Sequence, residues 1–246
     1  KKNLGYAKNF LLGLKEVGND YDFYAFSDQD DIWEKDKIIR GINALDLIGT
    51  KNHNTPKLYC SRTSYYNSEC KKEIGASKIH SRKPTFANSL LQNIAGGNTI
   101  IMNQIARNLV IKTVQAKEYI SHDWWCYQII SGAGGEIIFD KNKTVKYRQH
   151  NNNLIGKNNG FNDVKTRILE FVSGKVKKWS DVNLKNLSNF RYLLTKDNNE
   201  ILENFRKARV SKNIFKKLNF YFKSGVFRQS KKESIIFTIG LILNMI

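Results

Sequence analysis

The chain has 246 residues, a formal net charge of +19 and 41% hydrophobic residues. This length accommodates one large domain or two small ones, and the hydrophobic content excludes wholesale disorder. Three cysteines, Cys60, Cys70 and Cys126, show no metal-like spacing, so they predict free thiols in a reducing compartment.

The positive charge is concentrated in the C-terminal part of the chain. Residues 151–246 contain 19 Lys and Arg against 7 Asp and Glu, a balance of +12, while the first 150 residues carry +7. Nucleic acid, anionic membranes and phosphorylated substrates would all suit such a surface. Solubility, with a codon bias toward lysine, is the alternative explanation for part of the excess.

The first third of the chain predicts a helix, a strand and a second helix. Residues 6–17 have helical periodicity, with an inward face of Phe10, Leu11 and Leu14. The segment "FYAFS" at 23–27 predicts a short buried strand, and three aspartates follow its C-terminal end. A helix over about 35–48 is expected to bury Ile38, Ile39, Ile42 and Leu45.

Further helices and strands alternate as far as residue 150, which favours an α/β domain. A polar loop is expected at 67–84, and Thr85 is placed to cap the helix that follows it. The glycine turn of "GGNTIIMN" should lead into a strand. The expected strands are 57–67, the part of 96–103 that follows the glycine turn, 136–140 and 144–150. The expected helices are 85–93, 103–116 and 122–131.

A linker and a helical region make up the rest. "NNNLIGKNNG" at 151–160 has the composition of a linker. Beyond it, helices are expected at about 162–178, 182–208, 211–223 and 231–246. The last one is apolar but too short to span a bilayer, which needs ~20 residues. A packing helix is the first interpretation, and an interfacial anchor is the second.

The acidic stretch "SDQDDIW" suits a hard divalent cation. Asp28 and Asp30, two residues apart in an extended loop, point the same way. Mg²⁺ or Mn²⁺ takes one or two protein carboxylates and completes its shell with water and phosphate oxygens. The alternative is a solvated acidic turn in which Asp31 caps the next helix.

Two further stretches carry chemically suitable side chains. In "SHDWW", Asp123 could cap a helix, and Trp124 and Trp125 could be core residues, although aromatic faces also pack against sugar rings. In "KYRQH", Arg148 could pair with phosphate, and a neutral His150 could ligate a metal, at the end of a strand.

Taken together, "NLGYAKNF", "FSDQDDIW", "GGN", "SHDWW" and "YRQHNNNLIG" resemble inverting family 2 glycosyltransferases of the GT-A fold. The most similar branch is the rhamnosyltransferase-like enzymes that build bacterial surface polysaccharides. Five motifs occur in the family's order across roughly residues 1–156. The resemblance implies a nucleotide-diphosphate sugar donor, a Mg²⁺ or Mn²⁺ cofactor, and a glycan or lipid-linked glycan acceptor.

The same resemblance assigns roles by position. Asp28 matches the residue near the donor ribose or sugar, and Asp30 matches the metal ligand that bridges the diphosphate. Asp123 matches the general base, with His122 standing where many members have Glu. His150 matches a histidine that reaches the metal or diphosphate in some members.

The remaining assignments concern the donor and acceptor. Gly96, Gly97 and Asn98 match the glycine loop beside the donor sugar. Arg148 joins them as a donor-binding residue, and Trp124 and Trp125 are the expected acceptor contacts.

The resemblance also predicts the architecture. We expect an α/β, Rossmann-like mixed sheet flanked by helices in residues 1–156, followed by a basic helical region in 157–246. Family members begin with a strand and a "DDGS"-like turn that hold the base. This chain starts after them, so an N-terminally truncated fragment lacking the first strands, and inactive alone, is expected. "KKNLGYAKNF" is polar and basic, unlike a signal peptide, so a cytoplasmic location with peripheral contact to the inner face of the plasma membrane is expected.

Two other classes of function remain as alternatives to an enzyme. A nucleic-acid-binding module would explain the charge, but the sequence contains no recognisable reader, so no nucleic-acid partner is expected. A non-catalytic membrane-surface protein would explain the basic and terminally apolar tail, and membrane contact is compatible with an enzyme as well.

Overall fold

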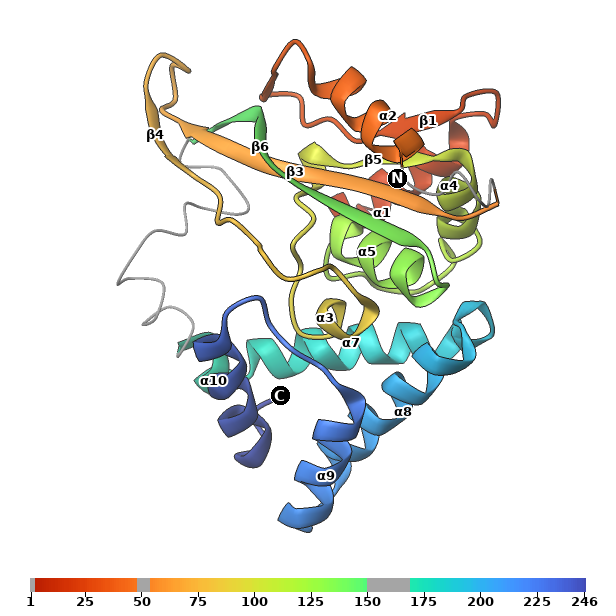
Figure 1. The fold of residues 1–246 in the computed structure, drawn as a ribbon, viewed down its shortest axis with the longest axis vertical. Coiled ribbons are helices and arrows are strands. Elements are labelled where there is room, and N and C mark those ends of the chain that lie inside the picture. The colour runs from red at the N-terminus through yellow and green to blue at the C-terminus, as the bar shows by residue number, and fades with distance from the viewer. Residues whose placement is uncertain (1–2, 48–53, 150–168) are drawn as a thin grey trace.

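A computed structural model describes residues 3–47, 54–149 and 169–246 of the chain. Its upper part is a curled mixed sheet with helices on both faces, and its lower part is helical (Figure 1). This confirms the expected α/β class with a helical C-terminal region. The expected linker at 151–160 and the proposed boundary between 156 and 157 lie outside the described residues.

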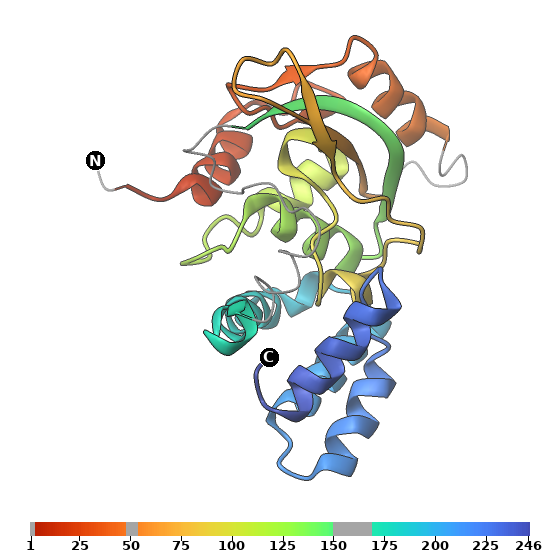
Figure 2. The ribbon, with the colours of Figure 1, turned by 90° about the vertical axis from the view of Figure 1, so that its left-hand side faces the viewer.

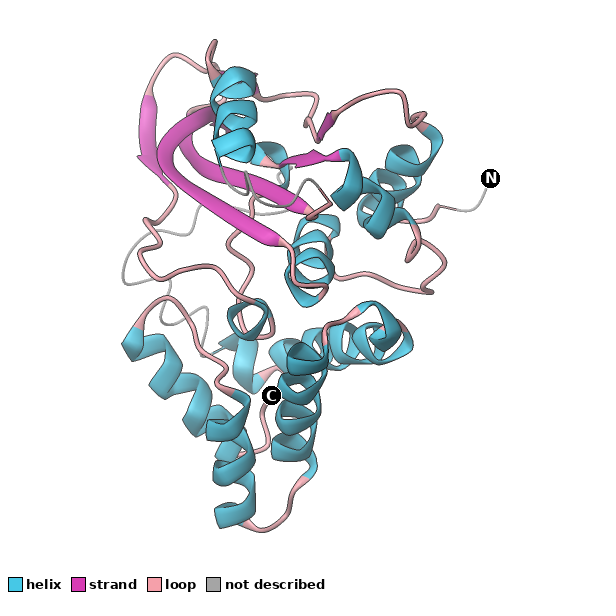
Figure 3. Ribbon diagram, turned by 45° about the vertical axis from the view of Figure 1, so that its right-hand side comes forward, coloured by secondary structure: helices cyan, strands magenta, loops and turns pink. Residues whose placement is uncertain are grey.

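Among the described residues, the sheet has six strands in the order β1-β5-β3-β6-β2, with β4 paired to β3. Only β3 and β6 run parallel, and the other pairs are antiparallel. Figure 3 shows β3 and β6 as the long curved strands of the sheet. The strands are β1 Phe23–Ala25, β2 Ile32–Trp33, β3 Lys57–Tyr66, β4 Glu73–Ala76, β5 Ile101–Asn103 and β6 Glu136–Arg148.

Helices cover both faces of this sheet. Helix α2 lies on one face, and α1, α4 and α5 lie on the other (Figure 1). Side chains alternate along β3 accordingly, with Leu58 and Cys60 in the larger core and Tyr59 packing under α2. These helices and the short α3 are α1 Tyr6–Glu16, α2 Lys37–Leu47, α3 Phe86–Ser89, α4 Gln104–Ile111 and α5 His122–Gly132.

The C-terminal helices pack below α3 and α5 (Figures 1 and 2). The hydrophobic core continues into them, since Leu187 and Phe205 belong to the same buried cluster as the sheet residues. Polar contacts reinforce the junction: the Asn186 side chain donates to the Glu118 carbonyl at 2.7 Å. The C-terminal helices are α7 Lys175–Asn189, α8 Lys196–Val210, α9 Ile214–Ser224 and α10 Lys231–Ile242.

Most predicted elements of the first 150 residues are confirmed, and local turn chemistry explains why. The Thr85 hydroxyl accepts the Asn88 amide at 3.2 Å and so begins α3, as expected. A short 3₁₀ turn at Gly97–Thr99 leads into β5, as the glycine turn predicted.

The buried face of helix α2 was predicted correctly at Leu45 and wrongly at Ile38 and Ile39. Lys37, Gly41 and Leu45 face the sheet, whereas Ile38 and Ile39 are exposed. The absence of a side chain at Gly41 permits this orientation, because a Cβ there would lie 2.4 Å from Ile101 Cδ1. The helix therefore packs through its glycine rather than through its isoleucines.

Strand predictions failed in two places. The expected polar loop at 67–84 contains β4, which pairs with the second half of β3. The expected pair of strands at 136–140 and 144–150 is one continuous strand, β6. A register shift against β3 occurs where the Asp140 side chain accepts the Asn142 amide at 2.8 Å. Residues with turn character thus form a bulge within one strand.

The first two C-terminal helices also have different limits. Gly174 adopts a left-handed conformation (φ 73°) before α7, so the expected helix over 162–178 is interrupted there. Helix α7 continues to Asn189, through the break expected near 180. The chain instead turns at Arg191–Leu193, and Thr195 caps α8.

Candidate functional site

Four elements bring the predicted site residues together. The acidic residues lie in the loop between β1 and β2, and the glycine turn precedes β5. Asp123 is in the first turn of α5, and Arg148 ends β6. These positions are far apart in the sequence, and hydrogen bonds connect them in the structure.

The glycine turn contacts both acidic parts of the site. The Gly97 amide donates to Asp123 Oδ2 at 3.1 Å, and the Asn98 side-chain amide donates to Asp31 Oδ2 at 2.5 Å. Asp31 Oδ1 also accepts the Arg148 backbone amide at 3.3 Å. Asp31 therefore links the acidic loop, the glycine turn and the end of β6. It does not cap α2, because that helix begins six residues later, at Lys37.

The three carboxylates of the loop are half-buried and repel one another. Burial raises the pKa of Asp28, and the charges of Asp30 and Asp123 raise it further. Burial also raises the pKa of Asp31 to about 6, although hydrogen bonds from Asn98 and Arg148 oppose this shift. Asp123 in α5 therefore lies close enough to Asp28 for the two charges to interact.

This donor set fits a divalent cation. Burial and neighbouring like charges raise the pKa of Asp28, so its carboxylate would gain from a bound cation, and Mg²⁺ needs only one or two carboxylates. Among the described residues, no group of three or more His, Cys, Asp and Glu side chains is placed to hold a metal ion. Asp28 and Asp30 are the residues available to hold such an ion, with the rest of its shell left to water and phosphate. The other expected ligand, His150, lies outside the described residues.

Lys37 is a site residue that the sequence prediction missed. It is 0% exposed, its Nζ donates to the Asn98 carbonyl at 2.8 Å, and that atom lies 3.4 Å from the centre of the Trp33 ring. Burial lowers the pKa of Lys37 to about 7, against the opposing attraction of Asp31 and Asp28. Its position four and eight residues before Gly41 and Leu45 was the available signal, but the isoleucines of α2 favoured another face.

Asp123 is buried at the start of α5. Besides Gly97, its carboxylate accepts the Trp124 amide at 2.6 Å. Ser121 precedes the helix and makes no side-chain capping bond. Two oxygens fixed by backbone amides leave further lone pairs on the carboxylate, so Asp123 retains the capacity to accept a proton.

His122 fills the space behind the glycine turn. It is 6% exposed and stacks on Phe10, with ring centroids 4.2 Å apart. Burial lowers the pKa of His122, although Asp123 opposes the shift, so the imidazole is neutral at pH 7. Its Nδ1 has no hydrogen-bond partner among the described residues, and its Nε2 would lie 2.6 Å from a Cβ at Gly97. Only glycine fits against this ring.

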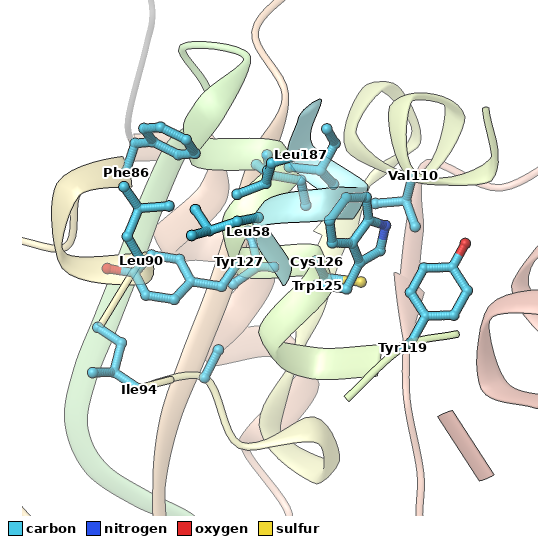
Figure 4. Packing of buried hydrophobic residues seen from close by; sticks show 14 of the residues in the cluster. Leu58, Phe86, Leu90, Ile94, Val110, Tyr119, Trp125, Cys126, Tyr127 and Leu187 are labelled. Carbon is cyan, nitrogen blue, oxygen red and sulfur yellow. The ribbon is translucent and has the colours of Figure 1, made fainter. Parts of the chain in front are cut away.

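The two tryptophans have different environments. Trp124 is partly exposed and donates to the Ser89 carbonyl at 2.7 Å. Trp125 is 1% exposed and donates to the Thr113 hydroxyl at 2.8 Å. Figure 4 shows Trp125 within the packed cluster beside Tyr119 and Val110. Its ring has no face open to a sugar, which agrees with the alternative of a core residue.

Arg148 extends from the end of β6 toward the turn after β3. Its Nε donates to the Cys70 sulfur at 3.3 Å. All three cysteines are free thiols, as expected, with Cys60 and Cys126 buried. No described helix is both long and apolar enough to cross a membrane.

The chain resembles a known protein over most of its length. The chain is 28% identical, over 249 aligned residues, to dTDP-rhamnosyl transferase RfbG of Shigella flexneri. The alignment covers 98% of this chain and 78% of that protein. No family model matches the chain. This identity, over most of the chain, supports a glycosyltransferase family.

Proposed function

We propose that the protein is a metal-dependent glycosyltransferase of family 2 and the GT-A fold. In this proposal it moves a sugar, such as rhamnose, from a nucleotide-diphosphate donor to a hydroxyl of a glycan or lipid-linked glycan. The observation that carries the proposal is the convergence of the acidic loop, the glycine turn and Asp123 through the bonds of Gly97 and Asn98. Similarity to a dTDP-rhamnosyl transferase supports rhamnose as the first sugar to test.

The donor would bind against the acidic loop. Asp28 and Asp30 would hold Mg²⁺ or Mn²⁺, which supplies Lewis-acid neutralisation of a diphosphate leaving group. Arg148 adds a guanidinium at the end of β6, and the glycine turn leaves room for a sugar close to the backbone. The charge of Asp123 reaches Asp28, so a donor bound at the loop would present its sugar to Asp123.

Asp123 would act as the general base. The acceptor hydroxyl oxygen attacks the anomeric carbon, and its proton passes to the Asp123 carboxylate. The bond between the anomeric carbon and the diphosphate oxygen breaks, with its electron pair remaining on the diphosphate. Displacement in a single step inverts the anomeric centre. Trp124 is partly exposed beside this carboxylate and is the available aromatic surface for the acceptor.

A donor panel tests the proposal. The full-length protein, including any residues before Lys1, would be incubated with nucleotide-diphosphate sugars, including dTDP-rhamnose, with glycan acceptors and with or without Mn²⁺. Release of the nucleotide diphosphate and the mass of the product would be measured. We expect metal-dependent transfer from one donor, and an inverted linkage by NMR. Transfer that continues unchanged in excess chelator would refute metal dependence, and no turnover with any donor would refute the enzyme.

A further inference from the structure

Lys37 occupies a position that costs stability. A buried lysine loses its hydration, and one hydrogen bond with one aromatic ring replaces it only in part. The lowered pKa of Lys37 indicates that burial outweighs the attraction of the nearby aspartates. An apolar side chain of similar length would fill the same space without this cost.

Lys37 holds the glycine turn from one side, and Asp31 holds it from the other. Lys37 binds the Asn98 carbonyl, and Asp31 binds the Asn98 side-chain amide. The next bond along the turn joins the Gly97 amide to Asp123. Asn98 is thus fixed at two atoms by two different elements, immediately beside the contact to Asp123.

We propose that Lys37 and Asp31 are positioning residues that fix the Gly96–Thr99 turn between the acidic loop and Asp123. The catalytic part of this proposal rests on the proposed glycosyltransferase function. Lys37 is fully buried and cannot touch a donor or acceptor, so it acts through the turn. A small displacement of a reacting group strongly reduces turnover, so fixing the turn would offset the cost of burying a lysine there.

The chain offers a matched control for the substitution Lys37→Met. Lys217 in α9 is 3% exposed and donates to the Leu241 carbonyl at 3.1 Å. Lys217→Met makes the same chemical change in a helix that lies away from the site (Figure 1). Hydrogen exchange of the Gly97 and Thr99 amides, melting temperature and turnover would be measured for both variants.

We expect Lys37→Met to speed exchange at the turn and to lower kcat at least tenfold without lowering the melting temperature. Lys217→Met should leave exchange at the turn and kcat unchanged. Unaltered exchange at Gly97 and Thr99 in Lys37→Met would overturn the proposal, and so would full turnover. If Lys37→Met does not fold, Asp31→Asn tests the same turn from the partly exposed side, and unaltered exchange there would overturn the proposal too.

These readouts separate the positioning proposal from the proposed function. If the full-length wild-type protein transfers no sugar from any donor, the glycosyltransferase proposal fails. Exchange at the turn still tests whether Lys37 fixes it, because exchange requires no substrate.

A different observation, on the C-terminal helices, carries a second inference. Helix α10 buries Phe237 and Leu241, whereas its outer face is apolar and exposed. This outer face, with the residue that follows the helix, consists of Ile235, Ile236, Ile239 and Leu243, which are 62%, 42%, 51% and 59% exposed. We call these four residues the α10 stripe.

Basic residues accompany the α10 stripe. Lys231 and Lys232 are exposed in the first turn of α10. The acidic residue of that turn, Glu233, is paired with Arg228 at 2.9 Å. Residues 151–246 as a whole carry +12. An exposed apolar stripe with a cationic end complements a lipid surface with anionic headgroups. The attraction between such a surface and each nearby basic residue contributes about 1 kcal/mol of binding free energy.

We infer that the α10 stripe binds peripherally to an anionic lipid bilayer. The full chain would be sedimented with vesicles of phosphatidylcholine alone and of phosphatidylcholine mixed with phosphatidylglycerol. We expect binding to the anionic vesicles, weakened by salt, and at least a tenfold loss in Ile239→Glu. Val210→Glu in α8, where the native valine is 79% exposed, is the matched control and should bind normally.

Three results would overturn this inference. The first is equal binding to neutral and anionic vesicles, and the second is binding that survives Ile239→Glu. The third is a dimer in light scattering that Ile239→Glu dissociates, since a second copy of the chain would then cover the stripe.

Discussion

Replacing Asp123 by Asn gives a test of the catalytic proposal with two separable effects. The carboxylate accepts the amides of Gly97 and Trp124 with its two oxygens. An asparagine has one oxygen and one NH₂ group, so one backbone amide would face a donor. Loss of one hydrogen bond to a charged acceptor costs roughly 1–3 kcal/mol of stability. The substitution is therefore less neutral than helix capping alone would imply.

The catalytic effect should be larger and should appear in a different quantity. A general base contributes about 10²–10⁴-fold to kcat, which corresponds to roughly 3–5 kcal/mol of the barrier. Asn cannot take the proton from the acceptor hydroxyl. Donor affinity should change little, because the variant retains Asp28 and Asp30. We therefore expect a large fall in kcat and a modest fall in melting temperature.

A variant with similar destabilisation provides the control for Asp123→Asn. Thr195 caps α8 by accepting the Asn198 amide at 3.2 Å, far from the site along the chain. Thr195→Ala should cost about 0.5–2 kcal/mol through loss of that cap. Turnover, donor binding by calorimetry and thermal unfolding would be measured for both variants below their melting temperatures.

The two variants should differ in kcat alone. Near-normal turnover in Asp123→Asn, with donor affinity intact, would remove Asp123 from the catalytic role. A fall in kcat for Thr195→Ala as large as that for Asp123→Asn would show that stability, rather than proton transfer, limits the reaction.

Three further predictions follow from the site. Asp30→Ala and Asp28→Ala should each weaken Mn²⁺-dependent binding of the nucleotide diphosphate, and calorimetry with and without Mn²⁺ would show whether they do. Gly97→Ala should lower the melting temperature and kcat, because the new Cβ would lie 2.6 Å from His122 Nε2; unchanged values of both would contradict this packing. The pKa of Lys37 is lowered to about 7, so the unfolded state binds more protons between pH 7 and 10. Stability relative to Lys37→Met should therefore rise over that range in urea titrations, and a flat difference would contradict the burial.

The parts of the fold that sequence predicted correctly depend on local chemistry. Thr85 accepts an amide three residues later, and the glycine turn comes directly before β5. Such signals act within a few residues, so they are visible in the chain itself. The positions of the candidate site residues at element ends were predictable for the same reason.

The failures depend on contacts between distant segments. Helix α2 shows a regular row of isoleucines, yet its buried face is decided by how closely Ile101 approaches Gly41. The break expected within β6 is a bulge whose existence depends on its pairing with β3. Neither partner is visible from local periodicity, so hydrophobic pattern alone gave the wrong orientation and the wrong strand count.

The same limit explains the missed part of the site. The sequence identified an acidic cluster but could not tell which carboxylate would meet Asn98, and that residue is Asp31. Lys37 was unremarkable as one lysine among many in a strongly basic chain. Its significance comes from burial beside Trp33 and Asn98, which only the tertiary structure provides.

The charges of the site also explain why acidic residues gather in a protein of net charge +19. Lysines on a solvated surface are screened over about 10 Å and give little help to a half-buried carboxylate. Lys37 supplies at most one cation from within, because burial lowers its own pKa to about 7, and the pKa values of Asp31, at about 6, and of Asp28 remain raised. One internal cation is therefore too little for the whole cluster. The partly exposed side of the loop, at Asp28 and Asp30, is where a divalent ion with a bound diphosphate could enter. A structural acidic turn would have no need for this arrangement, because ordinary polar residues could form it without like-charge repulsion.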